Sequence, residues 1–200
     1  MTDNFKERSK DYDANDMVQQ LSSAVGSCII ENVELNAQMQ LLDFGAGTGL
    51  ISSQVAPYVE KITAVDISQS MLDKLIAKPE ITDKVQALCH DMTVEPIGKE
   101  YDLIMSAMAM HHVEDTDNLV KRFSDHLKSG AKIALADLDK EDGSFHPEGM
   151  CDVYHEGFER SELQTTLEKH GFKDINFETA HTINGVTRPY PVFLALATKA

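Results

Sequence analysis

Short apolar segments alternate with segments of helical spacing along most of this 200-residue chain. Five apolar segments have the length of strands and lie at residues 39–44, 61–68, 83–91, 101–110 and 131–138. Four segments with helical spacing lie among and after them, at residues 48–59, 69–79, 115–130 and 160–172, and another precedes them at about 14–31. Strands that alternate with helices over short connections predict βαβ units, and therefore a parallel sheet covered by helices on both faces.

The last two apolar segments, residues 173–183 and 191–200, have no helix between them. We expect them to form an antiparallel hairpin at one edge of the sheet. The predicted fold class is therefore α/β: a doubly wound, Rossmann-like sheet of seven mostly parallel strands, the last of them antiparallel. No shift in composition marks a second domain, so we expect residues 1–200 to form a single domain with an N-terminal helical cap over residues 1–35.

The charge and composition of the chain disfavour several partners. With 33 acidic and 18 basic side chains, the formal net charge is −15, which repels the phosphates of nucleic acid and an anionic membrane surface. The three cysteines are far apart and show no C-x-x-C spacing, as in a cytoplasmic protein with reduced thiols. The first residues form no signal sequence, and no apolar run reaches the roughly 20 residues of a membrane span. We expect a cytoplasmic protein with no nucleic-acid and no membrane partner.

Three glycines, Gly45, Gly47 and Gly49, follow the first expected strand at once. Glycines permit a left-handed backbone and a close approach of a ligand, and the N–H groups at the start of the next helix bind polar groups. The dinucleotide pattern G-x-G-x-x-G fails by one residue, because Leu50 stands where the third glycine would be, and no P-loop lysine follows. The loop therefore indicates a polar ligand without identifying it.

Aspartates stand at the tips of the next two strands. Asp66 lies 17 residues after Gly49, where a carboxylate can accept hydrogen bonds from both hydroxyls of a ribose. Asp91 ends the third strand, where a carboxylate can accept a hydrogen bond from an adenine amino group. The tips of strands one to three thus offer a glycine cradle, a ribose site and an adenine site.

In this order the segments resemble the motifs of class I S-adenosylmethionine-dependent methyltransferases. "LLDFGAGTG" resembles their first motif, "AVDIS" the second, "HDMT" the third, "YDLIMSAMAMHHVED" the fourth, and "LKSGAKIALADL" the strand that follows. The resemblance extends from about residue 5 to the C-terminus and is greatest to the small enzymes of ubiquinone and menaquinone biosynthesis. It implies transfer of a methyl group from S-adenosyl-L-methionine to a small-molecule acceptor, with S-adenosyl-L-homocysteine as product, and a sheet of six parallel strands and one antiparallel strand.

The resemblance also implies which residues bind the cofactor. Asp43 and the loop that follows it would line the methionine portion, and Ile67 would pack against the adenine. The backbone of Met92 would assist Asp91 at the adenine amino group, Ser106 would lie beneath the methionine end, and Tyr12 would cover the cofactor. The complete implied set is Tyr12, Asp43, Gly45, Ala46, Gly47, Asp66, Ile67, Asp91, Met92 and Ser106.

The polar segment after the fifth strand, residues 139–160, is longer than an ordinary connection. Since strand tips one to three are used by the cofactor, we expect this segment to border the acceptor. Histidine suits proton transfer near neutral pH, and the candidates for a catalytic base are His146 and His155, then His111. We expect no metal site, because His111 and the adjacent His112 should diverge in a helix or loop.

Two other functions stay open. A non-catalytic protein that binds S-adenosylmethionine or S-adenosylhomocysteine would keep the strand-tip motifs but lack an acceptor cavity. An NAD-dependent oxidoreductase is disfavoured by the missing third glycine. The sequence N/D-P-P-Y/F, typical of many methyltransferases that act on nucleic acid, is absent after the fourth strand. The acceptor, its attacking atom and the oligomeric state, monomer or homodimer, stay open.

Overall fold

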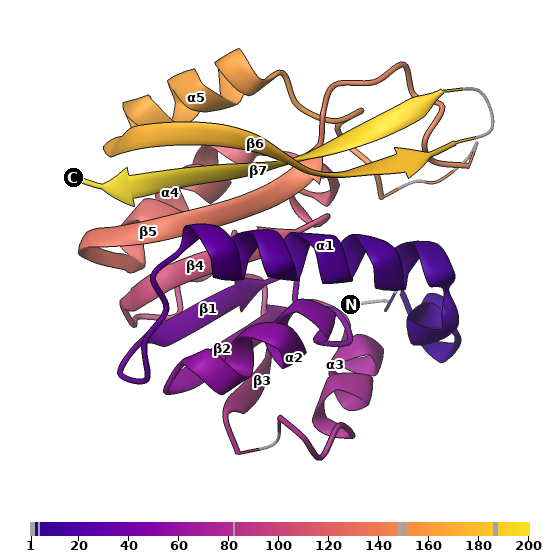
Figure 1. Cartoon of the computed structure of the whole chain (residues 1–200), viewed down its shortest axis with the longest axis horizontal. Coiled ribbons are helices and arrows are strands. Elements are labelled where there is room, and N and C mark those ends of the chain that lie inside the picture. Colours follow the sequence, from indigo (N-terminus) through magenta and orange to yellow (C-terminus); the bar gives the residue numbers. More distant parts are fainter. Residues whose placement is uncertain (1–2, 4, 82, 148–149, 151, 186–187) are drawn as a thin grey trace.

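A single seven-stranded sheet forms the centre of the molecule in the computed structural model, which describes residues 3, 5–81, 83–147, 150, 152–185 and 188–200 (Figure 1). The strand order is β3-β2-β1-β4-β5-β7-β6. The strands are β1 Gln40–Phe44, β2 Lys61–Asp66, β3 Val85–Cys89, β4 Tyr101–Ala107, β5 Leu127–Leu138, β6 Phe172–Asn184 and β7 Pro189–Lys199.

Only the last strand runs against the others. Strand β1 pairs in parallel with β2 and β4, and β2–β3 and β4–β5 are parallel too. Strand β7 is antiparallel to both of its neighbours, β5 and β6. The predicted α/β class, the edge hairpin and the antiparallel last strand are confirmed.

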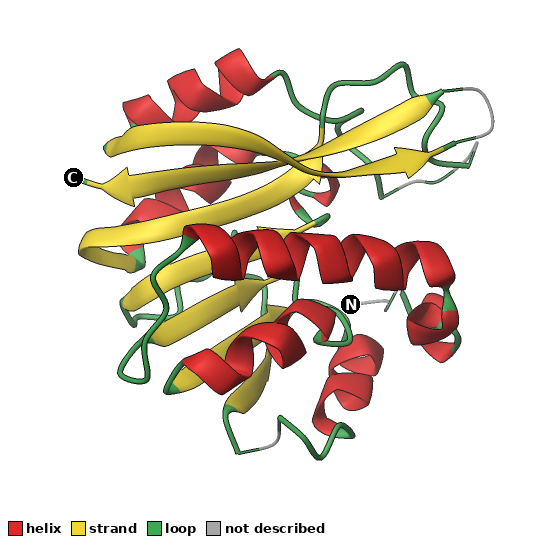
Figure 2. Cartoon of the chain, viewed as in Figure 1, coloured by secondary structure: helices red, strands yellow, loops and turns green. Residues whose placement is uncertain are grey.

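Helices cover both faces of this sheet (Figure 2). The α-helices are α1 Asp16–Asn32, α2 Leu50–Val55, α3 Gln69–Ile76, α4 Thr116–Asp125 and α5 Arg160–Lys169. The 3-10 helices are η1 Arg8–Lys10, η2 Tyr12–Ala14, η3 Ala56–Tyr58 and η4 Met110–His112. Buried side chains of α1, α2 and α3 belong to one hydrophobic core, and those of α4 and α5 belong to the other.

The two cores explain why the central strands are apolar without alternation. Leu41 of β1 lies in the first core and its neighbour Leu42 lies in the second. In β4, Leu103 and Met105 face the first core, whereas Ile104 faces the second. Successive side chains of a strand point to opposite faces, so a sheet covered on both sides needs apolar residues at every position.

The helix expected at residues 115–130 is shorter than predicted. Helix α4 begins after Asp115, whose side chain caps it, and ends at Asp125. Gly130, the last residue of this expected helix, has a left-handed conformation, with φ 78°, but it lies inside β5 rather than at a helix end. The register of β5 on β4 shifts nearby, since Tyr101 pairs with Leu127 and Leu103 pairs with Lys132. Gly130 therefore belongs to an irregular part of a strand and does not cap a helix.

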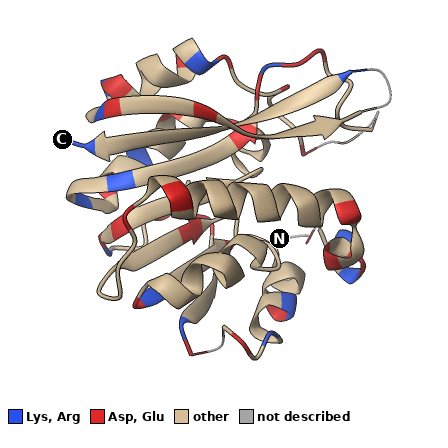
Figure 3. Cartoon of the chain, in the orientation of Figure 1, with Lys and Arg blue, Asp and Glu red and all other residues tan. Residues whose placement is uncertain are grey.

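Two surface properties bear on the expected partners. Within the described residues, no helix combines the length and the hydrophobicity that crossing a bilayer requires. Lys and Arg are scattered over many elements of the ribbon, with Asp and Glu among them (Figure 3). The predicted cytoplasmic location and the absence of nucleic-acid partners stay predictions.

Candidate functional site

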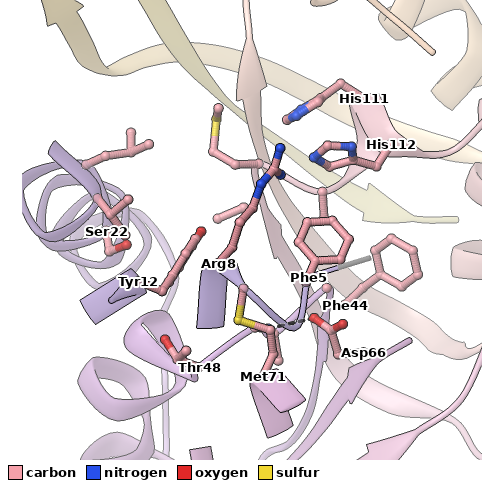
Figure 4. A pocket seen from close by; sticks show the side chains of 18 of the residues that line it. Phe5, Arg8, Tyr12, Ser22, Phe44, Thr48, Asp66, Met71, His111 and His112 are labelled. Atoms are coloured by element: carbon pink, nitrogen blue, oxygen red, sulfur yellow. Dashed lines mark hydrogen bonds between the residues drawn. The ribbon is translucent and has the colours of Figure 1, made fainter. Parts of the chain in front are cut away.

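The carboxyl ends of the central parallel strands open into a cavity of about 1390 Å³. Its walls include the glycine loop after β1, residues after β2, β3 and β4, and the N-terminal segment before α1. Small-molecule pockets usually occupy about 300–1,000 Å³. The cavity therefore has room for more than one ligand. Figure 4 shows that Arg8, Tyr12, Asp66 and His112 reach this space from different parts of the chain.

The glycine loop is held in place by hydrogen bonds to β2. The amides of Gly45 and Ala46 both donate to the carbonyl of Val65, at 2.9 and 3.0 Å. The amide of Gly47 donates to Asp66 Oδ2 at 2.8 Å. The loop and the second strand tip are thus one hydrogen-bonded unit, which was not evident from the spacing of the glycines.

Gly45 and Gly47 are required for different reasons, although both have positive φ. A Cβ at Gly45 would lie 2.3 Å from the Cβ of Ala109, so this glycine allows the loop to pack against the end of β4. A Cβ at Gly47 would meet nothing within 4 Å, and Gly47 lines the cavity. Gly47 therefore leaves space for a ligand, whereas Gly45 leaves space for the protein itself.

Two strand-tip carboxylates lie in the cavity wall, as expected. Asp66 Oδ1 accepts from the amide of Ser68 at 2.8 Å. Burial raises the pKa of Asp66, the nearby charge of Asp3 acts in the same direction, and the hydrogen bonds from Ser68 and Gly47 oppose the rise. Asp91 Oδ1 accepts from the amide and the hydroxyl of Thr93 at 3.0 and 2.6 Å. Each carboxylate keeps lone pairs for a ligand.

Asp43, in the middle of β1, is a buried carboxylate at the floor of the cavity. The hydroxyl of Ser52 donates to its Oδ2 at 2.6 Å. Burial raises the pKa of Asp43 to about 7, against a usual value of 3.8, and the charge of Asp66 adds to the rise. A cation bound in the cavity would favour the ionised form of this carboxylate.

The N-terminal segment closes one side of the cavity. Asp3 accepts from the hydroxyl of Ser68 at 2.8 Å and from the amide of Ser70 at 3.0 Å, at the start of α3. Tyr12 lines the cavity, and burial and the charges of Asp66 and Asp13 raise its pKa. The expected cap over residues 1–35 thus consists of two 3-10 turns and α1, as far as its described residues show.

Two residues of the implied cofactor set have side chains outside the described cavity wall, and their expected roles stay predictions. Ser106 is buried in β4, its hydroxyl has no hydrogen-bond partner, and it does not line the cavity. Strand β4 ends one residue later, so Ala107, Met108 and Ala109 form the wall instead. Met92 is fully buried in the core beneath α4. Its neighbours Asp91 and Thr93 line the cavity, as does the half-exposed Ile67.

At the other end of the cavity, His111 is anchored by a buried carboxylate. His111 Nδ1 lies 2.7 Å from Asp137 Oδ1, and the side chains are 2% and 0% exposed. The backbone amide of His111 also donates to Asp137 Oδ2 at 3.2 Å. With Nδ1–H donated to the carboxylate, the lone pair of this imidazole is on Nε2.

His112 and His146 come together with His111, contrary to the expectation that adjacent histidines diverge. The ring centroids of His111 and His112 are 4.2 Å apart, and that of His146 is 5.0 Å from His111. The chain turns sharply at Met108, which has φ 55°, and then enters η4. In this tight 3-10 turn both side chains face the 139–160 segment. We call His111, His112 and His146 the histidine cluster.

Burial and mutual repulsion keep His112 and His146 from gaining charge. Burial, followed by the charges of His111, His112 and Arg8, lowers the pKa of His146 to about 4. Burial also lowers the pKa of His112, followed by the effect of His111. His146 and His112 are therefore neutral near pH 7.

His155, a predicted base, does not reach the cavity. Its Nε2 lies 2.9 Å from the carbonyl oxygen of Val113, and its ring packs on Phe158 at 5.3 Å. The amides of Tyr154 and His155 both donate to the carbonyl of His111. This part of the 139–160 segment supports η4 from behind, so the contacts of His155 are structural. Of the three predicted bases, His146 and His111 line the cavity.

Arg8 and His112 were missed by the sequence analysis. The guanidinium of Arg8 lies within 4.0 Å of Asp152 Oδ2, and His112 Nδ1 is hydrogen-bonded to the carbonyl of Asp152. Arg8 lies more than 100 residues from Asp152 in the sequence. No local pattern marks such a residue, since only the fold brings it to the cavity.

Comparison with known sequences places these residues in a family. A model described as a methyltransferase domain matches residues 16–176. An uncharacterised methyltransferase of Schizosaccharomyces pombe is 31% identical over 147 residues, which cover 64% of this chain and 51% of that protein. Malonyl-[acyl-carrier protein] O-methyltransferase of Priestia megaterium is 27% identical over 135 residues, covering 66% and 48%. The chain thus spans about half the length of these relatives.

Solved structures share the fold over nearly the whole chain. Magnesium protoporphyrin IX methyltransferase of Synechocystis PCC 6803 with bound S-adenosylhomocysteine has a TM-score of 0.74 at 15% identity, covering 99% of this chain and 95% of that one. Phosphoethanolamine N-methyltransferase 2 of Haemonchus contortus with S-adenosylmethionine has a TM-score of 0.74 at 16% identity, covering 98% and 59%. At 15–16% identity, this similarity shows a shared fold alone.

None of these comparisons specifies the ubiquinone and menaquinone type, which stays a prediction. The family model itself runs from the first residue of α1 into β6, across the glycine loop, Asp66, Asp91 and η4. With the fold and the strand-tip geometry described above, the chain belongs to the family of methyltransferase domains, of the class I, S-adenosylmethionine-dependent kind.

Proposed function

We propose that this protein transfers a methyl group from S-adenosyl-L-methionine to a small-molecule acceptor. The supporting observation is that one cavity joins two differently equipped ends. The strand-tip end consists of the glycine loop, Asp43, Asp66 and Asp91. The histidine end consists of the histidine cluster and Arg8. Two fold neighbours contain the same cofactor or its product.

The strand-tip end matches the parts of the cofactor one by one. The two oxygens of Asp66, each already fixed by one backbone amide, accept hydrogen bonds from the ribose hydroxyls. Ile67 packs against the adenine and Asp91 accepts from its amino group. The open space at Gly47 admits the cofactor chain, and the ionised carboxylate of Asp43 faces its ammonium group. Tyr12 covers the cofactor from the N-terminal side.

Chemistry takes place where the methyl group faces the histidine end. The sulfonium already activates the methyl group, so the protein chiefly aligns the acceptor for in-line attack. His111 is oriented by Asp137 and presents Nε2 as an acceptor for the proton of a hydroxyl, amine or thiol. The sulfur–methyl bond breaks as the new bond forms, and neutral S-adenosylhomocysteine leaves.

The relatives and fold neighbours differ in the acceptors that their names specify. Their names specify malonyl-[acyl-carrier protein], phosphoethanolamine and magnesium protoporphyrin IX. For this chain we propose an acceptor small enough for the space beside the cofactor. Arg8, directed into the cavity in Figure 4, is suited to an acidic group on such a molecule.

The alternative is a protein that binds the cofactor without turnover. Such a protein would keep the strand-tip end of the cavity and would need no space for an acceptor. The large volume of the cavity and the buried His111–Asp137 pair favour the enzyme, because a polar pair of this kind is costly to bury without a purpose.

An acceptor screen tests the proposal. The purified protein is incubated with S-adenosylmethionine and with panels of carboxylates, phenols, amines and thiols, and release of S-adenosylhomocysteine is measured. We expect at least one panel to raise the release rate, and Gly47→Val to remove that rise because its side chain occupies the cofactor space. Binding of S-adenosylhomocysteine with no acceptor-dependent release in any panel would favour the non-catalytic alternative.

A further inference from the structure

The histidine cluster has a geometry that proton transfer does not require. One ring nitrogen from each of His111, His112 and His146 lies within 4.8 Å of the other two. A single base needs one imidazole, and a second and third neutral imidazole add little to it. Three converging nitrogen donors are instead the ligand set of a transition-metal ion.

Hydrogen bonds already orient two of the imidazole rings in the way that the rings of metal-binding histidines are usually oriented. His111 Nδ1 is hydrogen-bonded to the Asp137 carboxylate, and His112 Nδ1 is hydrogen-bonded to the carbonyl of Asp152. Such hydrogen bonds leave the lone pair on Nε2 and orient the ring. A carboxylate or a backbone carbonyl behind a metal-binding histidine is the usual arrangement of this second layer of contacts.

The local charges also suit a cation. The carboxylates of Asp137 and Asp152 lie behind the imidazoles, at 2.7 Å from His111 Nδ1 and 3.9 Å from His112 Nδ1. The guanidinium of Arg8 is the opposing charge, and it is paired with Asp152 at 4.0 Å. Among the described residues, the acidic groups next to the cluster therefore outnumber the basic ones.

We propose that His111, His112 and His146 bind a divalent transition-metal ion, with Zn²⁺ as the best-suited ion, and leave one coordination position open toward the cavity. A three-histidine set with an open position is typical of catalytic rather than structural zinc sites. Within the described part of the chain, no cysteine belongs to this group of ligands. The cluster therefore differs from structural zinc sites, in which cysteine thiolates bind the metal.

The cluster has to contract slightly to bind. In a tetrahedral site with metal–nitrogen distances of about 2.0–2.1 Å, the ligand nitrogens lie about 3.4 Å apart. The largest separation here is 4.8 Å, so one ring must move by about 1.4 Å to reach that geometry. His111 is fully buried, whereas His146 is partly exposed in the 139–160 segment, so rotation of His146 provides this movement.

The consequence for catalysis rests on the proposed function. A hydroxyl or thiol of the acceptor bound at the open position would lose its proton to water more easily, since the metal would stabilise the anion. The acceptor heteroatom then attacks the methyl carbon, the sulfonium becomes a thioether, and one proton is released per methyl group transferred. With the metal bound, Nε2 of His111 is a ligand, so loss of the acceptor proton to water would replace proton removal by His111.

Metal titration of the chelator-treated full chain tests the site without cofactor or acceptor. We expect one Zn²⁺ per chain by calorimetry, and visible absorption bands of tetrahedral Co²⁺ when Co²⁺ is used as the probe. His146→Ala removes a ligand and should weaken Zn²⁺ binding at least about 100-fold, since even a lost second-layer contact costs about 10–100-fold. His155→Ala is the matched control, because it removes a histidine of the same 139–160 segment that lies outside the cluster, and it should leave the affinity unchanged.

Two outcomes would overturn the site. The first is that His146→Ala binds Zn²⁺ as tightly as the wild type does. The second is that His155→Ala loses as much Zn²⁺ affinity as His146→Ala, which would indicate adventitious surface binding. Thermal melting of each variant identifies loss of folding, and His112→Ala, at a less buried position than His111, repeats the test if His146→Ala is unstable. Full methyl-transfer rate after metal removal would overturn the catalytic role, while failure of S-adenosylhomocysteine binding would concern the proposed function alone.

Discussion

The two ends of the cavity are built in different ways. The strand-tip end is local: the glycine loop, Asp66 and Asp91 each follow directly from a neighbouring strand, and backbone hydrogen bonds join the first two. The histidine end combines η4, the 139–160 segment, Asp137 of β5 and Arg8 of the N-terminal segment. The strand-tip end is therefore determined by the sheet itself, whereas the histidine end depends on segments that can vary without changing the sheet.

This difference predicts a separation of effects. Changes at the strand-tip end should affect cofactor binding or folding, because its loop is part of the sheet edge. Changes at the histidine end should affect acceptor chemistry or metal binding and leave the cofactor in place. The following variants test this separation, from the largest expected effect to the smallest.

Substitution within the glycine loop should separate folding from binding. Gly45→Ala should lower the free energy of unfolding by about 2–5 kcal/mol, since its Cβ overlaps Ala109 and its φ is positive. Gly47→Ala meets no atom and should cost only the left-handed backbone, about 1–2 kcal/mol. Urea denaturation of both variants measures the difference. Equal losses would show that the two glycines do not have separate roles.

The buried carboxylate of Asp43 should make stability depend on pH. Its pKa is about 7 in the folded chain against 3.8 as the usual value. As pH rises from about 4 to about 7, the unfolded chain loses this proton before the folded chain does, so the free energy of unfolding falls across this window.

The matched variant is Asp43→Asn, which cannot ionise and keeps an acceptor for Ser52. Without cofactor it should be more stable than the wild type above pH 7, by about 2–4 kcal/mol at most, and the difference should vanish near pH 4. Denaturation curves at several pH values test this. A constant difference between the two proteins would contradict the raised pKa.

Loss of the ribose acceptor should weaken the cofactor without unfolding the chain. Asp66→Ala should reduce affinity for S-adenosylhomocysteine by about 1.5–3 kcal/mol, the scale of hydrogen bonds to a charged group. Asp66→Asn is the control that retains the shape and one acceptor, and its loss should be smaller. Calorimetric titration of both variants, with circular dichroism as a check on folding, tests the role of Asp66 as the ribose acceptor. Unchanged affinity in Asp66→Ala would contradict this role.

The smallest effect is expected at His155. His155→Ala loses a hydrogen bond to the carbonyl of Val113 and contact with Phe158, and it should cost about 0.5–1.5 kcal/mol of stability. Affinity for S-adenosylhomocysteine should stay within about threefold, a difference below 1 kcal/mol. A strong loss of methyl transfer in a stable His155→Ala protein would restore this residue to the site.

The same contrast explains how much could be predicted from the sequence. The strands, their mostly parallel order and the positions of Asp66 and Asp91 follow from local patterns, because a parallel sheet brings its carboxyl ends to one edge. Gly130 shows the limit of such patterns. It ends the segment whose spacing predicted a helix, but the register of β5 on β4 makes it part of a strand.

The histidine end could not be predicted in the same way. The convergence of His111 and His112 depends on the turn at Met108 and on η4, which replace the end of a longer expected strand. His146 joins them from a segment without periodicity. Contacts between segments that are distant in sequence leave no local pattern to read.

Titration with S-adenosylhomocysteine tests the central claim most directly, namely that one cavity holds the cofactor at its strand-tip end only. We expect the wild type to bind one molecule per chain, with no comparable binding of NAD. His146→Ala should retain this affinity within about threefold, although it disrupts the histidine cluster. Failure of the wild type to bind S-adenosylhomocysteine, or a loss in His146→Ala as large as in Asp66→Ala, would contradict the account.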